Sequence, residues 1–110
     1  MDMNVFCLVQ TSIDDEAKAE AIAEALVTQR LAACVQIAPV RSVYIWKGAV
    51  AREKEFVLSA KARRADFDAV CAAIKALHSY EVPEIIAVPF TGEEAYMEWV
   101  WRETERRRSE

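Results

Sequence analysis

Glycine is scarce in this sequence, and its scarcity excludes several kinds of nucleotide site. Only Gly48 and Gly92 occur among the 110 residues. Glycine-rich phosphate loops and dinucleotide fingerprints each need at least two glycines at close spacing, and these two lie far apart. No apolar run approaches the roughly 20 residues that a membrane-spanning helix needs. The sequence therefore predicts neither a nucleotide-binding loop nor a membrane span.

Histidine, cysteine and basic charge are also limited. The chain has one histidine, three cysteines and a formal net charge of −4, a balance that disfavours binding to nucleic acid. Its basic cluster, residues 106–108, follows the last predicted helix and is typical of a solvated tail. Cys7, Cys34 and Cys71 are widely spaced in apolar sequence, unlike a disulfide framework or a zinc ribbon. We expect buried thiols in a reducing cytoplasm, and residues 1–4 lack the basic region of a signal peptide.

The chain alternates strands and helices within one expected domain, residues 1–110. Apolar or alternating runs predict strands at 4–11, 31–46, 49–62 and 84–90. Apolar residues spaced three and four apart predict helices at 14–30, 66–78 and 93–107. The order strand, helix, strand, strand, helix, strand predicts an α+β, ferredoxin-like split βαβ sandwich, in which two helices cover a four-stranded antiparallel sheet. The added C-terminal helix would cover an edge or an exposed region of that sheet.

Local signals add detail to this outline. Ser12, followed by acidic residues, predicts the N-terminal cap of the first helix. Pro39 predicts a bend or bulge within the second strand. The dipeptide 47–48 predicts the turn of a long hairpin, because glycine readily takes a positive φ. The second helix presents a predicted core face: Phe67, Val70, Ile74 and Leu77.

Aromatic residues on the hairpin predict self-association. Tyr44 and Trp46 alternate onto a single face, where large aromatics form either an exposed patch or an interface. We favour the interface, because hairpins of several copies can cover each other's edges and faces. Trp99, on the C-terminal helix, belongs to the core or to the same interface. The pattern predicts a symmetric homo-oligomer.

Four segments together resemble the divalent-cation tolerance (CutA) family. They are Arg30-Leu31-Ala32-Ala33-Cys34-Val35, Ser42-Val43-Tyr44-Ile45-Trp46-Lys47-Gly48, His78-Ser79-Tyr80-Glu81-Val82-Pro83-Glu84-Ile85-Ile86 and Tyr96-Met97-Glu98-Trp99. Their order and spacing match the family over nearly the whole chain. The resemblance implies a ferredoxin-like fold assembled as a homotrimer, a cytoplasmic location in bacteria, and a link to tolerance of copper and other divalent metals.

The resemblance also implies a candidate metal site. Some family members carry two further proposed copper ligands, at positions occupied here by Gln10 and Leu77, so that only His78 of that set remains. Glu81 and Glu84 lie near it in sequence and offer oxygen ligands. This set predicts at most weak binding of Cu²⁺ or another divalent cation. The other interpretation of His78 is structural: it closes a helix and bonds to the last carbonyl groups.

A second group of residues suggests a cleft between subunits. Glu55 and Lys61, with Glu53, lie on the second long strand, where charged residues usually form solvated or cross-strand pairs. If they face a neighbouring chain, they line a polar cleft with Trp46 and Tyr80. The alternative function is then a regulatory or scaffold trimer that binds a small anion or metabolite, rather than a metal, in these clefts.

Enzyme activity is not expected. The fold also hosts acyl phosphatases, which need an arginine in a phosphate-binding loop after the first strand. Residues 10–15 are acidic there and contain no arginine, so a phosphate would be repelled. The lone histidine has no nucleophilic partner at a fixed spacing.

Overall fold

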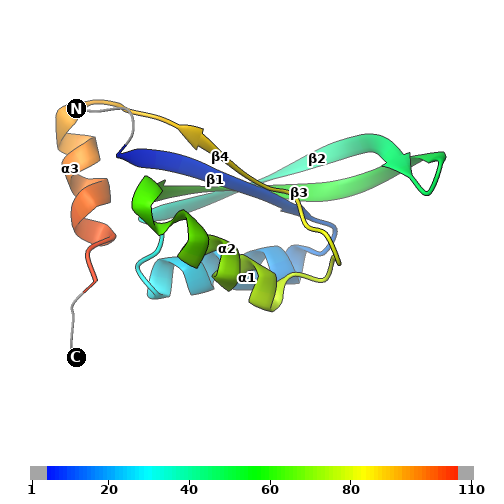
Figure 1. Ribbon diagram of the computed structural model, residues 1–110, viewed down its shortest axis with the longest axis horizontal. Coiled ribbons are helices and arrows are strands. Elements are labelled where there is room, and N and C mark those ends of the chain that lie inside the picture. The colour runs from blue at the N-terminus through cyan, green and yellow to red at the C-terminus, as the bar shows by residue number, and fades with distance from the viewer. Residues whose placement is uncertain (1–4, 107–110) are drawn as a thin grey trace.

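The computed structural model describes residues 5–106, which form an antiparallel sheet with the first two helices on one face (Figure 1). The elements in chain order are β1 (Phe6–Ile13), α1 (Glu16–Thr28), β2 (Cys34–Trp46), β3 (Ala49–Arg63), a 3-10 turn η1 (Arg64–Asp66), α2 (Phe67–Leu77), β4 (Ile85–Pro89) and α3 (Glu94–Glu103). The sheet order is β2-β3-β1-β4, and all neighbouring strands are antiparallel. This confirms the ferredoxin-like α+β prediction. The predicted strand start at residue 4, the predicted helix end at residue 107 and most of the basic cluster lie outside the described residues.

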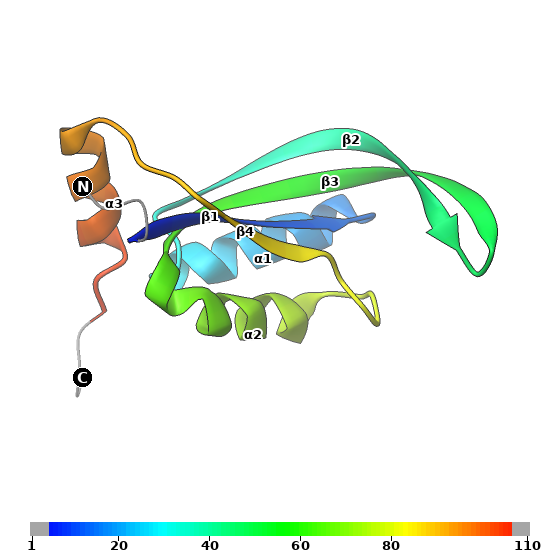
Figure 2. The ribbon, with the colours of Figure 1, turned by 45° about the horizontal axis from the view of Figure 1, so that its top comes forward.

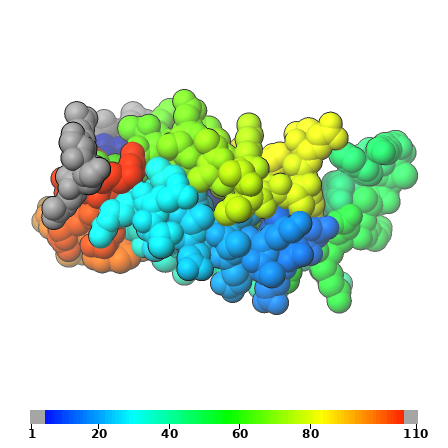
Figure 3. All heavy atoms as spheres, turned by 90° about the horizontal axis from the view of Figure 1, so that it is seen from below, coloured from blue at the N-terminus to red at the C-terminus, as the bar shows by residue number. Residues whose placement is uncertain are grey.

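The main core lies between the sheet and the pair α1 and α2, which cover one face of it (Figures 2 and 3). Alternate residues of β1 point into this core, because side chains along a strand alternate between faces. The buried side chains that form it are Cys7, Val9, Ile13, Ala19, Ile22, Leu26, Leu31, Ala32, Leu58, Ala60, Ala62, Val70 and Ile74. Leu77 was predicted to join them, but it is 42% exposed at the last position of α2. The prediction of Leu77 as a core residue is wrong, because Ile74 is the last residue of α2 that packs into the core below the sheet.

The helix α3 lies at the end of the sheet opposite the hairpin tip (Figure 1). Its Met97 and Val100 are buried against Phe6, which alternates with Cys7 and so points away from α1 and α2. Arg63 holds the helix from β3: its guanidinium lies 3.4 Å from the Trp101 ring centroid and donates to the Trp101 carbonyl at 2.6 Å. The expectation that the third helix covers an exposed region of the sheet is confirmed.

The predicted cap of the first helix and the bulge considered at Pro39 are both absent. Ser12 is a buried residue of β1, and the cap of α1 is Asp15, whose Oδ1 accepts from the Lys18 N–H at 3.0 Å. Of the bend or bulge predicted at Pro39, the bulge is absent, because β2 is continuous and Pro39 pairs with Phe56 in unbroken register. A proline is tolerated there because β2 is an edge strand, in which alternate N–H groups need no partner.

The long hairpin of β2 and β3 extends past the end of β1 and curves as a unit (Figure 2). Its turn has positive φ at both central residues, 51° at Lys47 and 80° at Gly48, as a type I′ turn requires. The predicted turn is confirmed. The outer part of the hairpin makes no ladder with β1, so its side chains are free to line a surface hollow.

Candidate functional site

A pocket of about 420 Å³ lies where the hairpin passes the loop after α2, and we call it the hairpin pocket. Its lining residues are Ser12, Asp14, Tyr44, Trp46, Glu53, Glu55, Tyr80, Glu81, Val82 and Glu84. They come from β2, β3, the end of β1, the β1–α1 junction and the loop between α2 and β4. Three aromatic rings and five carboxylates therefore meet in one hollow.

The hairpin wall follows directly from strand alternation. Tyr44 pairs with Ala51 and Ser42 pairs with Glu53, so even positions of β2 share a face with odd positions of β3. Tyr44, Trp46, Glu53 and Glu55 consequently point to one side. The expectation that the two aromatics share a face is confirmed. The other side of the outer hairpin carries exposed Val43, Ile45 and Val50 together with basic residues.

His78 fixes the opposite wall by two hydrogen bonds to backbone. Its Nε2 lies 2.7 Å from the Ser12 carbonyl oxygen, and its Nδ1 accepts from the Tyr80 N–H at 3.0 Å. A carbonyl only accepts, so Nε2 carries the proton and the ring is the neutral Nε2–H tautomer. His78 is the C-cap of α2, and its backbone N–H donates to the Ile74 carbonyl at 2.9 Å, so its predicted place at the helix end is confirmed. The ring itself bonds to β1 and not to the last carbonyls of α2, which differs from the predicted contact. The ring also packs edge-on to Tyr80, with centroids 4.7 Å apart.

Tyr80 then connects this loop to the hairpin. Its hydroxyl donates to Glu55 Oε2 at 2.6 Å. Burial, and next the hydrogen bond to the Glu55 carboxylate, raise the pKa of Tyr80 far above its usual value. Glu55 is only 6% exposed, so this hydrogen bond satisfies part of a buried charge. The pKa of Tyr44 is also raised, first by desolvation and then by Glu53.

The predicted cleft residues are only partly brought together in one chain. Trp46, Tyr80 and Glu55 all line the hairpin pocket. Lys61 lies on the same face of β3 as Glu55 but six positions later, which is about 20 Å away at the usual rise per residue. There its ammonium donates to the Tyr96 hydroxyl at 2.9 Å, an interaction that raises the pKa of Lys61. A place for Lys61 in a cleft between subunits stays a prediction about the assembled protein.

The predicted metal ligands do not converge in the single chain. Glu81 and Glu84 line the pocket, whereas both nitrogens of His78 are already bonded to backbone groups. Among residues 5–106, no group of three or more histidine, cysteine or carboxylate side chains is arranged to hold a metal ion. The residues present therefore do not fit a tightly held resident metal. Cys7 is buried, and burial raises the pKa of its thiol and that of Cys71. Cys34 and Cys71 are only partly buried, so the expectation of buried thiols is confirmed for Cys7 alone.

The predicted interface residues have different surroundings. Tyr44 is half-buried and Trp46 is 56% exposed. Trp99 packs on the cluster formed by Phe6 and α3, with its ring 5.6 Å from that of Tyr96. Contact of any of these residues with another chain stays a prediction.

Sequence reasoning missed Asp14 as a site residue. Asp14 is one of the acidic residues after Ser12 that were taken only as a sign of a helix start, but it lines the pocket. Since β1 ends at Ile13 and the helix starts at Glu16, Asp14 lies in the short link that passes the hairpin. No sequence signal distinguishes it from its neighbour Asp15, which caps the helix.

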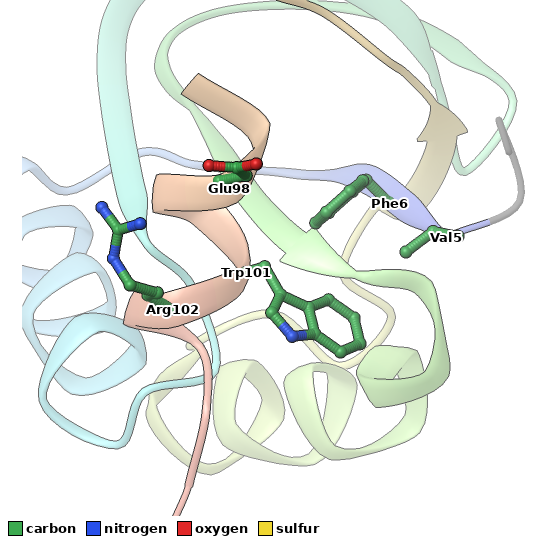
Figure 4. Close-up of a pocket in the computed structure, with 5 residues that line it drawn as sticks. All are labelled: Val5, Phe6, Glu98, Trp101 and Arg102. Carbon is green, nitrogen blue, oxygen red and sulfur yellow. The ribbon is translucent and has the colours of Figure 1, made fainter. Parts of the chain in front are cut away.

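A second hollow, of about 400 Å³, lies between the start of β1 and α3 (Figure 4). It is lined by Val5, Phe6, Glu98, Trp101 and Arg102. Its lining has one acidic side chain, Glu98, and one basic side chain, Arg102, so the two charges offset each other. The Trp101 ring already packs against the Arg63 guanidinium. This hollow lacks the concentration of like charge and aromatic surface that distinguishes the hairpin pocket.

Comparison with known proteins identifies the family. The model of the family described as CutA1 divalent ion tolerance protein matches residues 7–103. The chain belongs to the CutA1 family. The divalent-cation tolerance protein CutA of Thermus thermophilus is 40% identical over 99 residues, which cover 88% of this chain and 96% of that protein.

Other relatives extend the comparison. The solved structure titled as the periplasmic divalent cation tolerance protein CutA from Archaeoglobus fulgidus has a TM-score of 0.89 at 33% identity. That match covers 91% of this chain and 99% of the other. The chloroplastic CutA 1 protein of rice is 36% identical over 99 residues, and the match spans only 56% of that longer protein. None of the helices within residues 5–106 combines the length and apolarity needed to cross a bilayer.

Proposed function

We propose that this protein takes part in the tolerance of divalent metal ions as a cytoplasmic homotrimer that holds copper or another divalent cation weakly. Membership of the CutA1 family, whose description names divalent ions, is the observation that carries this proposal. The proposal assigns the protein no catalysed reaction.

The charge of the hairpin pocket supports weak attraction of cations. Asp14, Glu53, Glu55, Glu81 and Glu84 surround one hollow, and none of the residues that line it is basic. Like charges around a concave surface raise the local concentration of counter-ions. Weak and reversible binding follows from such a field even without a complete ligand set.

The open sheet face supports self-association. Beyond the part covered by α3, Ile86 and Val88 are exposed, at 46% and 44%, on the face opposite α1 and α2. Edge strands β2 and β4 also retain backbone groups without a neighbouring strand in the described chain. A symmetric assembly would cover both features.

Calorimetric titration of the full chain with Cu(II) and Zn(II) tests the metal part of the proposal. We expect weak binding that is reduced in Glu81→Gln and Glu84→Gln. A His78→Ala variant, measured beside them, decides the predicted role of the imidazole as a ligand. Titrations without heat for the unmodified protein would remove metal binding from the proposal.

A second candidate function is a regulatory trimer that binds a small metabolite. The hairpin pocket favours it, because Tyr44, Trp46 and Tyr80 provide the aromatic surface typical of small-molecule sites. Its acidic walls favour a cation over the anion considered from the sequence. A thermal-shift screen tests this candidate, because a ligand that binds only the folded protein raises its Tm.

A further inference from the structure

The hairpin pocket combines two features that attract cations in different ways. The rings of Tyr44, Trp46 and Tyr80 line it, and aromatic faces attract ammonium groups through their negative electrostatic potential. Carboxylates line the same pocket and accept hydrogen bonds from N–H donors. An ammonium group with N–H bonds can use both features, whereas an anion can use neither.

The carboxylates are distributed around the wall and do not converge on one point. Asp14 comes from the link after β1, Glu53 and Glu55 from β3, and Glu81 and Glu84 from the loop after α2. No three acidic, histidine or cysteine side chains within residues 5–106 are placed to hold one metal ion. Several negative charges at separate positions match a ligand whose positive charges are also separate.

The outer hairpin already contains a small example of this contact. The Lys47 ammonium lies 5.9 Å from the centroid of the Trp46 ring. Lys47 is an alkylammonium on a chain of methylene groups, so the indole of Trp46 accepts that chemistry within the protein. Trp46 is 56% exposed and retains surface for a ligand.

We propose that the hairpin pocket binds a linear aliphatic polyamine in its protonated form. The methylene groups pack on the aromatic rings, and the separate ammonium groups donate to carboxylates on different parts of the wall. Primary ammonium groups of this kind stay charged at neutral pH, since their pKa resembles the value of about 10.4 for lysine. The volume of about 420 Å³ lies in the range of small-molecule sites.

Other cations fit the pocket less well. A quaternary ammonium ion carries a single charge and no N–H donor, so it leaves most of the carboxylates without a partner. A bare divalent ion needs several oxygens at close range to replace its hydration shell. This inference rests on the second candidate function, the binding of a metabolite, and is independent of the proposed role in metal tolerance.

Titration calorimetry of the full chain, in a buffer free of amines and at low salt, tests the proposal. The probes are spermidine, putrescine, tetramethylammonium and Mg²⁺. We expect spermidine to bind most tightly, putrescine next, and the two control ions at least about ten-fold more weakly than spermidine, because charge-assisted hydrogen bonds add to the ring contacts.

Matched variants separate a site from general electrostatic attraction. Glu53→Gln removes a pocket carboxylate, and Glu20→Gln removes an exposed carboxylate of α1 with the same change in net charge. We expect Glu53→Gln to weaken spermidine binding about ten-fold and Glu20→Gln less than two-fold. Trp46→Leu should weaken binding and abolish any change in tryptophan fluorescence caused by spermidine. If Glu53→Gln alters the melting curve, Glu81→Gln in the exposed loop replaces it.

Three results would each overturn the proposal. The first is a titration of spermidine without heat or fluorescence change. The second is equal affinity for tetramethylammonium or Mg²⁺. The third is equal weakening by Glu20→Gln and the pocket variants. A hit for another small molecule in the thermal-shift screen would then keep the metabolite function while excluding polyamines, and the metal titrations report separately on metal tolerance.

Discussion

At the scale of single residues, Tyr80 joins the loop after α2 to the hairpin through two hydrogen bonds. Its N–H donates to His78 Nδ1, and its hydroxyl donates to Glu55 Oε2. Part of this cluster was predictable from the sequence: Trp46, Tyr80 and Glu55 were placed in one cleft. The role of His78 as a backbone anchor was not predictable, because its partner, the Ser12 carbonyl, is 66 positions away in the chain.

The Tyr80→Phe variant should destabilise the protein by about 1–3 kcal/mol, because it removes the donor to a carboxylate that is 6% exposed. Urea unfolding measures the loss. The matched control is Tyr96→Phe, which removes a hydroxyl that is bonded only to Lys61 at the surface, and there we expect a change below about 0.5 kcal/mol. Equal losses in the two variants would contradict a special contribution from the Glu55 contact.

The raised pKa of Tyr80 predicts a loss of stability in alkali. An acid whose pKa is higher in the folded state binds its proton more tightly there, so its contribution is complete below the unfolded pKa of about 10 and falls as the pH rises above it. Absorbance of phenolate at 295 nm, followed with pH, should show Tyr80 ionising only as the chain unfolds. Since the pKa of Tyr44 is raised as well, the late step in Tyr80→Phe should be smaller by the absorbance of one phenolate. A normal titration of Tyr80 would contradict the buried contact.

At the scale of elements, most of the architecture follows from periodicity. The strand and helix order and the Lys47–Gly48 turn were predicted from alternation, helical spacing and glycine placement. The errors occur where tertiary context decides. Ser12 has a good capping side chain, but it continues β1 because the strand pairs with β3 as far as Ile13. Pro39 produces no bulge, because alternate positions of an edge strand such as β2 need no N–H group, and proline lacks one.

Arg63 contacts α3 at three points, and these contacts give a prediction for that helix. Arg63 bonds to the Trp101 carbonyl and, through Nε, to Thr104 Oγ1 at 2.9 Å, while its plane lies over the Trp101 ring. Lysine lacks the planar fork, so Arg63→Lys should cost about 1–2 kcal/mol and increase hydrogen exchange in α3.

Arg52→Lys, on the exposed outer hairpin, is the control, because it makes the same substitution away from α3. We expect it to change the free energy of unfolding by less than about 0.5 kcal/mol. Unchanged exchange protection of α3 in Arg63→Lys would show that Met97 and Val100 hold the helix without this contact.

At the scale of the whole molecule, the uncovered sheet face predicts self-association. One chain has a mass of 12.4 kDa, and light scattering of the proposed trimer should give about three times that value. Val88→Lys places a charge on the uncovered face, so we expect the mass to fall toward that of one chain.

Val27→Lys is the matched control, because Val27 is exposed to nearly the same extent, 43% against 44%, but belongs to α1. It should leave the mass unchanged. An unmodified protein that scatters as a single chain in dilute buffer would remove the oligomer from the proposed function. The sequence predicted association from the aromatic hairpin, but could not indicate which face would take part.

Ten of the described residues of a single chain line the hairpin pocket, and three of them are aromatic. Each copy in an assembly would therefore carry its own binding site, and one copy could bind a ligand while the sites of its neighbours are empty. A saturation curve should then be hyperbolic, with one equivalent taken up per polypeptide and a Hill coefficient of about 1. Sigmoidal uptake would instead indicate that the copies communicate.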